Sequence, residues 1–160
     1  MATRLMLMMA TMALVAACGT SGSALASTDC QDTQGSAAER PTREEICRLV
    51  NNERRAEGRP ALKLDRELTE LAQWFADDMN QKGYFSHEAP DGTSMSHRLK
   101  RFKIRYSAAG ENIAQGQDSP GDVVGSWMRS PGHKENIMNG EYRKLGTARS
   151  GDYWVQVFTD

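Results

Sequence analysis

The order of the expected elements predicts an α+β fold, with helices along most of the chain and a pair of strands at its end. Amphipathic stretches with helical spacing cover residues 43–57 and 65–83. The period changes near the C-terminus, where Leu145–Ala148 and Tyr153–Phe158 are strand-like runs joined by a turn over residues 149–152. Helices followed by an antiparallel pair are typical of the α+β class.

Residues 1–17 have the features of a lipoprotein-type signal peptide. Arg4 supplies a positive region, and the apolar run from Leu5 to Ala17 is shorter than the roughly 20 residues that a membrane-spanning helix needs. Small residues precede Cys18, which would carry the lipid. The alternative is cleavage after Ala24-Leu25-Ala26, which would release a soluble secreted protein. We therefore expect an exported protein, either a lipoprotein at the outer face of a membrane or in the periplasm, or an extracellular protein.

Residues 18–41 are expected to form a flexible tether, because they are mostly small and polar. Lipidation of Cys18 would leave Cys30 and Cys47 as a pair in an oxidising compartment. A disulfide between them would fasten the tether to the first helix, and two free thiols are the alternative. The chain has no Cys-x-x-Cys motif, which disfavours a thiolate metal site.

Length and charge predict one domain, residues 42–160, which we expect to be a monomer. The 160-residue chain has a net charge of −1, with acidic and basic residues interspersed and no basic stripe. Nucleic acid is therefore not an expected partner. After loss of the signal the chain is long enough for one core and too short for two.

The helices have recognisable ends. Thr42 and Glu45 form a capping box that would start the first helix, and Gly58 would end it. Asp65 is the expected N-cap of the second helix, which would end at Gly83.

Three shorter elements are expected after the second helix. Ser94 or Ser96 would cap a short helix, and Ser119 followed by Pro120 would begin another that stops at Ser130-Pro131-Gly132. A further short turn would begin at His133.

Three short clusters predict one functional site. They are Ser86-His87, Gly110-Glu111-Asn112 and Ser130-Pro131-Gly132-His133. Histidine can bind a metal or carry a proton near neutral pH, and a carboxylate beside it can act as counter-ion, ligand or base. Glu111 enters an apolar stretch, so we expect it to be partly buried and to need a partner, for which the two histidines are the candidates. We expect all three side chains to converge in one cleft.

The sequence around these clusters resembles the CAP superfamily (cysteine-rich secretory, antigen 5, pathogenesis-related 1) in its bacterial, SCP-domain form. Four segments in the same order carry the resemblance, which covers about residues 43–159: Phe85–Gly92, Ala109–Ala114, Trp127–Met138 and Tyr153–Phe158. The resemblance implies an α-β-α sandwich, whose third layer the sequence pattern alone does not predict. It also implies that His87 and Glu111 lie in the central cavity.

The chain departs from the eukaryotic pattern of two histidines and two glutamates. The strand that would carry the last histidine reads Tyr153-Trp154-Val155-Gln156, and Ser130 stands at the place of the second glutamate. His133 is the candidate to fill the vacated space, with Ser130 as its hydrogen-bonding neighbour. Asn112 and Asn136 are expected to be structural amides.

The leading functional hypothesis is a non-enzymatic envelope module that binds a small-molecule, lipid or peptide ligand. His87 and His133 could hold zinc or another divalent cation, so the first alternative is a metal-dependent hydrolase of peptide or envelope polymer, with Glu111 as base. Neither a Gly-x-Ser-x-Gly nor a His-Glu-x-x-His motif supports it. The second alternative is a structural interaction domain, whose polar cluster only fastens loops. The membrane is an expected partner through the lipid anchor.

Overall fold

The computed structural model describes residues 28–33 and 36–160. The predictions for the signal peptide and for Cys18 fall outside these residues. Within them, the elements in chain order are η1 (Thr28–Cys30), α1 (Arg40–Ala56), β1 (Lys63–Leu64), α2 (Arg66–Lys82), α3 (Met95–Arg101), β2 (Ala109–Gln115), α4 (Pro120–Arg129), α5 (Pro131–Met138), β3 (Lys144–Ser150) and β4 (Tyr153–Thr159). None of the helices described is long and apolar enough to cross a membrane.

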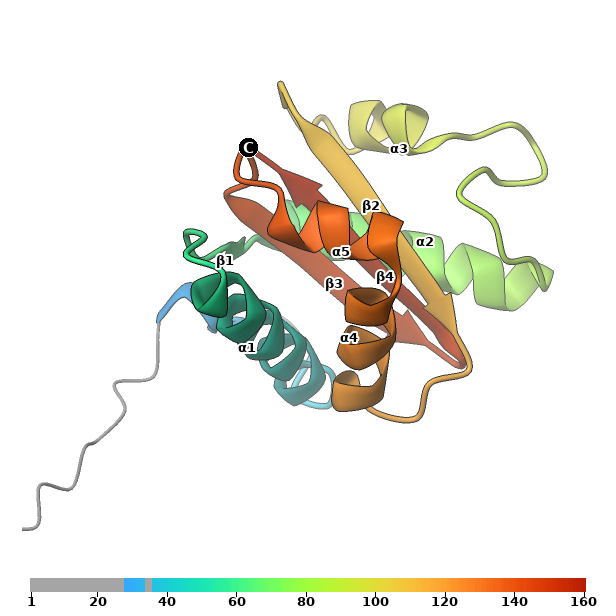
Figure 1. Cartoon of the computed structure of the whole chain (residues 1–160). Helices are drawn as coiled ribbons and strands as arrows, with labels where there is room; N and C mark the ends of the chain where they lie inside the picture. The colour runs from blue at the N-terminus through green and yellow to red at the C-terminus, as the bar shows by residue number, and fades with distance from the viewer. Residues whose placement is uncertain (1–27, 34–35) are drawn as a thin grey trace, which may run out of the picture.

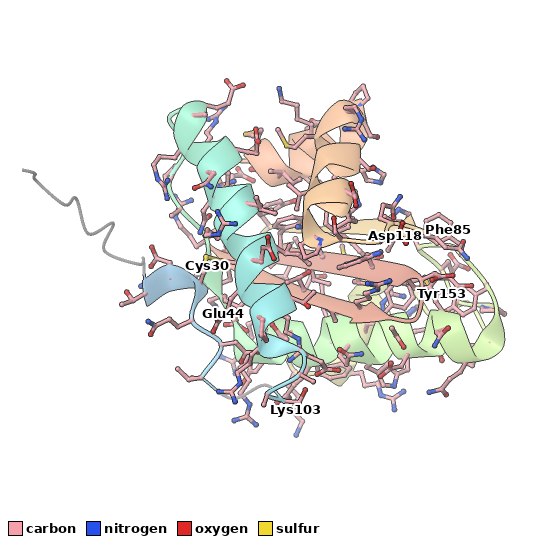
Figure 2. The ribbon with its side chains drawn as sticks, turned by 90° about the horizontal axis from the view of Figure 1, so that it is seen from below. Cys30, Glu44, Phe85, Lys103, Asp118 and Tyr153 are labelled. Atoms are coloured by element: carbon pink, nitrogen blue, oxygen red, sulfur yellow. A yellow bond between two sulfur atoms is a disulfide. The ribbon has the colours of Figure 1, made fainter. Side chains whose placement is uncertain are left out.

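One mixed sheet lies between two helical layers. The strand order is β1-β3-β4-β2, with β1 parallel to β3 and the other pairs antiparallel. Helix α2 packs against β3 and β4 on one face, whereas α1, α4 and α5 cover the other (Figure 1). Figure 2 shows the three layers edge-on. The predicted α+β class and the α-β-α sandwich are confirmed.

The core has two halves, one on each face of the sheet, and β4 contributes to both. Trp154 and Phe158 pack with α1 and α4, while Val155 and Val157 pack with α2. Successive side chains of a strand point to opposite faces, so a central strand between two layers is buried on both. Gly146 on β3 lets α2 approach closely, since a side chain there would overlap the backbone of Leu68.

The strongest predicted helix and the hairpin are confirmed. The Asp65 side chain accepts a hydrogen bond from the Leu68 N–H at 3.0 Å, and Gly83 ends α2 in the left-handed conformation. Strands β3 and β4 are joined by the two residues Gly151 and Asp152, within the predicted turn.

Two predicted helix starts are wrong. Helix α1 begins at Arg40 rather than near Arg43, and its N-cap Glu39 makes no side-chain capping bond, so the capping box at Thr42 does not form. Pro41 explains the earlier start, because proline is favoured in the first turn of a helix. The same preference makes Pro131 the start of α5, where we expected only a stop and a turn.

The N-terminal segment is fastened to α1 as predicted. Cys30 and Cys47 form a disulfide with a Cα–Cα distance of 5.5 Å, and the Asn51 amide lies within hydrogen-bonding distance of both sulfur atoms. The disulfide thus ties η1 to the domain. The folded part of the chain therefore includes residues before position 42, where we expected the domain to begin.

Candidate functional site

His87 lies in the loop between α2 and α3. The structure has no strand in this loop. Two side-chain contacts place this loop beside the sheet. The Phe85 ring centroid lies 6.4 Å from that of Tyr153 on β4, and the His87 imidazole contacts Glu111 on β2. Figure 2 labels Phe85 and Tyr153 at the same end of the molecule.

Glu111 is buried, as expected, but its main partner is an arginine that the sequence analysis did not identify. The fully buried Arg98 of α3 donates through Nη2 to both carboxylate oxygens, at 2.9 Å to Oε1 and 2.8 Å to Oε2. Its guanidinium lies 3.5 Å from the ring centroid of Phe75. Charge-assisted bonds of this kind compensate for the burial of both ions.

Arg98 also fixes the backbone of the loop that carries His87. Its Nη2 donates to the His87 carbonyl at 3.0 Å, and its Nη1 donates to the Thr93 carbonyl at 3.1 Å. The loop is thus tied to the same buried cation that holds Glu111. A sequence signal for Arg98 did exist: it follows Met95 by three residues and therefore lies near the apolar face of α3.

The carboxylate orients the His87 imidazole. His87 Nδ1 lies 2.9 Å from Glu111 Oε1. Since that oxygen accepts from Arg98, the imidazole is the donor, and Nδ1 carries the proton. In the neutral ring Nε2 is then an acceptor. The His87 side chain is 57% exposed, whereas the Glu111 side chain is 3% exposed.

A groove of about 310 Å³ opens at this pair. It is lined by His87, Glu88, Ser94, Met95 and Glu111. A larger groove of about 480 Å³ runs beside α1, where Figure 2 labels Cys30 and Glu44, but it has no imidazole in its walls. The α1 groove has the larger volume, but the smaller groove contains the oriented His87 imidazole. We therefore take the smaller groove as the candidate binding site.

His133 and Ser130 lie at the start of α5 in the other helical layer, and neither lines the groove at His87. The Asn112 amide donates to the His133 carbonyl at 3.2 Å. Burial lowers the pKa of His133 below its ordinary value, and the nearby charge of His87 lowers it further. Ser130 is the residue between α4 and α5, and among the described contacts its hydroxyl bonds to none of the other candidate residues.

Asn112 and Asn136 form the amide network that we expected. Asn136 donates to the Glu111 carbonyl at 3.2 Å and to Asn112 Oδ1 at 2.9 Å. Trp127 Nε1 donates to the Ile113 carbonyl at 3.2 Å in the same way. Because β2 is an edge strand, these side chains donate to backbone carbonyls on the side where no neighbouring strand donates.

The residues do not fit a closed metal site. The part of the chain that the structure describes contains no group of three or more His, Cys, Asp or Glu side chains that could hold a metal ion. Both Glu111 oxygens accept from Arg98, so among the predicted site residues the imidazoles of His87 and His133 remain as candidate ligands. A two-histidine site for zinc or another divalent cation stays a prediction.

Comparisons with known proteins agree on the fold. A family model described as the cysteine-rich secretory protein family (CAP) matches residues 47–158. The uncharacterized protein YkwD of Bacillus subtilis is 40% identical over 115 residues, which cover 71% of this chain and 45% of that protein.

Solved structures give the same result. An extracellular protein containing an SCP domain from Bacillus anthracis matches with a TM-score of 0.71 and 30% identity, over 72% of this chain and 39% of that one. An outer surface protein of Borrelia burgdorferi matches with a TM-score of 0.67 over 74% of this chain and 94% of that one, and its 24% identity shows the fold alone. This chain spans less than half the length of both Bacillus proteins.

Proposed function

This chain belongs to the cysteine-rich secretory protein (CAP) family, and on that premise we propose that it is an exported envelope protein whose groove at His87 and Glu111 binds a ligand without catalysing a reaction. The observation that carries the proposal is the buried Arg98–Glu111 pair, which holds an exposed imidazole in one orientation. A pre-oriented acceptor at the mouth of a groove is what ligand binding requires.

The exposure of His87 favours binding over a merely structural role. A histidine that only fastened a loop would bury its ring, yet more than half of this side chain is open to solvent. The loop is already fixed by the Arg98 bonds to the carbonyls of His87 and Thr93. The imidazole is therefore free for a partner at Nε2.

The groove favours a small or extended ligand with a polar group. Met95 supplies an apolar surface, while Ser94 and Glu88 supply polar ones. A short peptide, a lipid with a polar headgroup or another small amphipathic molecule could place a hydrogen-bond donor against Nε2 and its apolar part against Met95. These are the ligand classes expected from the sequence.

Titration followed by the imidazole C–H resonances in NMR tests this function. Zinc chloride, a short peptide and a fatty acid are added in turn, and the proposal expects at least one to shift the His87 resonances. His87→Ala should abolish that binding, whereas His97→Ala, which removes another exposed histidine, should retain it. Equal binding by both variants, or no shift with any probe, would contradict a ligand site at His87.

The predicted signal peptide supports a location outside the cytoplasm, and the relatives named above include an extracellular and an outer surface protein. We infer that Cys18 carries a lipid anchor. Labelled fatty acid should enter the wild type and not Cys18→Ser. A mature N-terminus at Ser27 would instead indicate ordinary cleavage after Ala26.

The metal-dependent hydrolase is the weaker candidate. Glu111 would have to act as base, but both of its oxygens accept bonds from Arg98. Zinc affinity of two imidazoles alone should be modest and should decrease as the pH falls through about 6.5. Calorimetry with zinc on the wild type and on the double variant His87→Ala/His133→Ala measures it, and equal binding by both would exclude these ligands.

A further inference from the structure

We propose that the segment from Lys100 to Tyr106, which comprises the end of α3 and the first part of its link to β2, is a contact surface for the anionic headgroups of a phospholipid bilayer. We call it the basic segment. It makes no use of the His87 groove, and its test does not depend on the function proposed above.

The charge of the basic segment is concentrated and unpaired. Lys100, Arg101, Lys103 and Arg105 are all exposed. Within the described residues none of the four forms an ion pair, and the Arg101 guanidinium lies 4.9 Å from the ring centroid of Trp74. Since the whole chain has a net charge of −1, this cluster is a local feature. The expectation of interspersed charges overlooked it.

The fold turns these cations outward. Phe102 and Ile104 are half-buried and pack against the core half that contains α2. Lys103 and Arg105 alternate with them and are exposed. Lys103 has a φ of 58° in the turn that ends α3, where the Ile104 N–H bonds to the Leu99 carbonyl at 3.0 Å. Figure 2 shows Lys103 at the outer margin of the α2 layer.

The arrangement fits an extended anionic surface better than a single small anion. The four cations follow one another along a stretch of chain and line none of the described grooves. The chain continues into Tyr106, which is 42% exposed. Tyrosine is enriched at membrane interfaces, and basic residues beside a membrane are attracted by its anionic lipids.

Co-sedimentation with lipid vesicles tests the proposal. The chain that begins at Ser27 serves as the protein, because both core halves lie within residues 30–158. We expect it to bind vesicles of phosphatidylglycerol and phosphatidylcholine, and to be released by salt at about 1 M, where the Debye length is about 3 Å. Vesicles of phosphatidylcholine alone should bind little.

A charge-matched pair of variants locates the surface. Lys100→Gln/Lys103→Gln/Arg105→Gln should weaken vesicle binding by about a hundredfold, because each basic residue near an anionic membrane contributes about a factor of five.

The control Arg48→Gln/Arg55→Gln/Lys63→Gln removes the same charge from α1 and β1 and should bind like the wild type. If the triple variant of the basic segment does not show the wild-type thermal transition, Arg105→Glu alone is used instead, and it should also weaken vesicle binding. Equal weakening by both triple variants, or equal binding to neutral vesicles, would overturn the proposal. Binding of soluble polyphosphate without binding of vesicles would also overturn it, in favour of an anionic polymer.

Discussion

Replacing Arg98 with methionine should cost about 3–5 kcal/mol of unfolding free energy, the usual effect of removing one partner of a buried ion pair. The contacts give the same magnitude. Arg98 Nη2 has two hydrogens, which it shares among both Glu111 oxygens and the His87 carbonyl, and a bond to a charged group contributes about 1.5–3 kcal/mol. A domain of this size has roughly 5–15 kcal/mol in total, so the variant should fold with a small margin.

Urea denaturation of a double-mutant cycle measures the pair. Glu111→Gln removes the charge that Arg98→Met leaves buried and alone. The double variant should therefore be more stable than the sum of the two single effects predicts, by about 2 kcal/mol, within the range for residues in contact. Arg101→Met is the matched control on the same helix, and it should cost less than about 1 kcal/mol because Arg101 is exposed.

Two results would refute this reasoning. A cost of Arg98→Met no greater than that of Arg101→Met would mean that the guanidinium does not compensate for burial of the carboxylate. Additive effects of Arg98→Met and Glu111→Gln would mean that the two residues do not stabilise one another.

The sequence predicted those elements whose signals are local. Helix α2 has its cap at Asp65 and its left-handed end at Gly83, both within one turn of the element they bound. The hairpin has a change of period and a Gly-Asp turn. In each case, the residues that decide the structure are neighbours in the chain.

The sequence did not predict β2, because long-range pairing makes it a strand. Its residues Ala-Gly-Glu-Asn-Ile-Ala-Gln are mostly poor strand formers. The strand forms beside β4, where Glu111 faces Val157 and Ile113 faces Val155. Trp127 and Asn136 then bind its carbonyls from the helical layer.

Two buried arginines were missed for the same reason. Arg54 is fully buried, and its guanidinium donates to the carbonyls of Ile137 at 2.6 Å and Asn139 at 2.8 Å. Those acceptors follow it by more than 80 residues. Arg98 donates to the carboxylate of Glu111, which follows it by 13 residues. A charged residue in an amphipathic helix normally faces water, and the tertiary contacts show that these two arginines are buried instead.

The family resemblance named His87 and Glu111 as candidate site residues, but not the arginine that binds Glu111. We attributed the stabilisation of Glu111 to the two histidines, whereas Arg98 supplies the two bonds that bury it. Since the guanidinium neutralises the carboxylate, the eukaryotic set of two histidines and two glutamates is not needed to keep Glu111 buried here. The site can therefore stay assembled although the last histidine of that set is absent.

The remaining predictions concern Gly110 and His133. Gly110→Ala should destabilise the protein by about 1–3 kcal/mol, since the added Cβ would lie 2.5 Å from the Tyr142 hydroxyl in the packed core. Gly132→Ala is the control. A Cβ at Gly132 would have no atom within 4 Å, so this variant should keep the thermal midpoint of the wild type. Equal midpoints for the two variants would contradict the close approach. His133 should make the free energy of unfolding depend on pH. Burial and the charge of His87 lower the pKa of His133 in the folded state. As the pH falls past about 6.5, the unfolded chain therefore binds more protons than the folded one. This contribution to stability is complete above that pH and is lost progressively below it. The difference in urea midpoint between the wild type and His133→Gln, compared at about pH 7.5 and about pH 5.5, isolates it from other titrating groups. The wild type should lose more stability than the variant on acidification, and an equal loss in both would show that the burial of His133 does not affect its protonation.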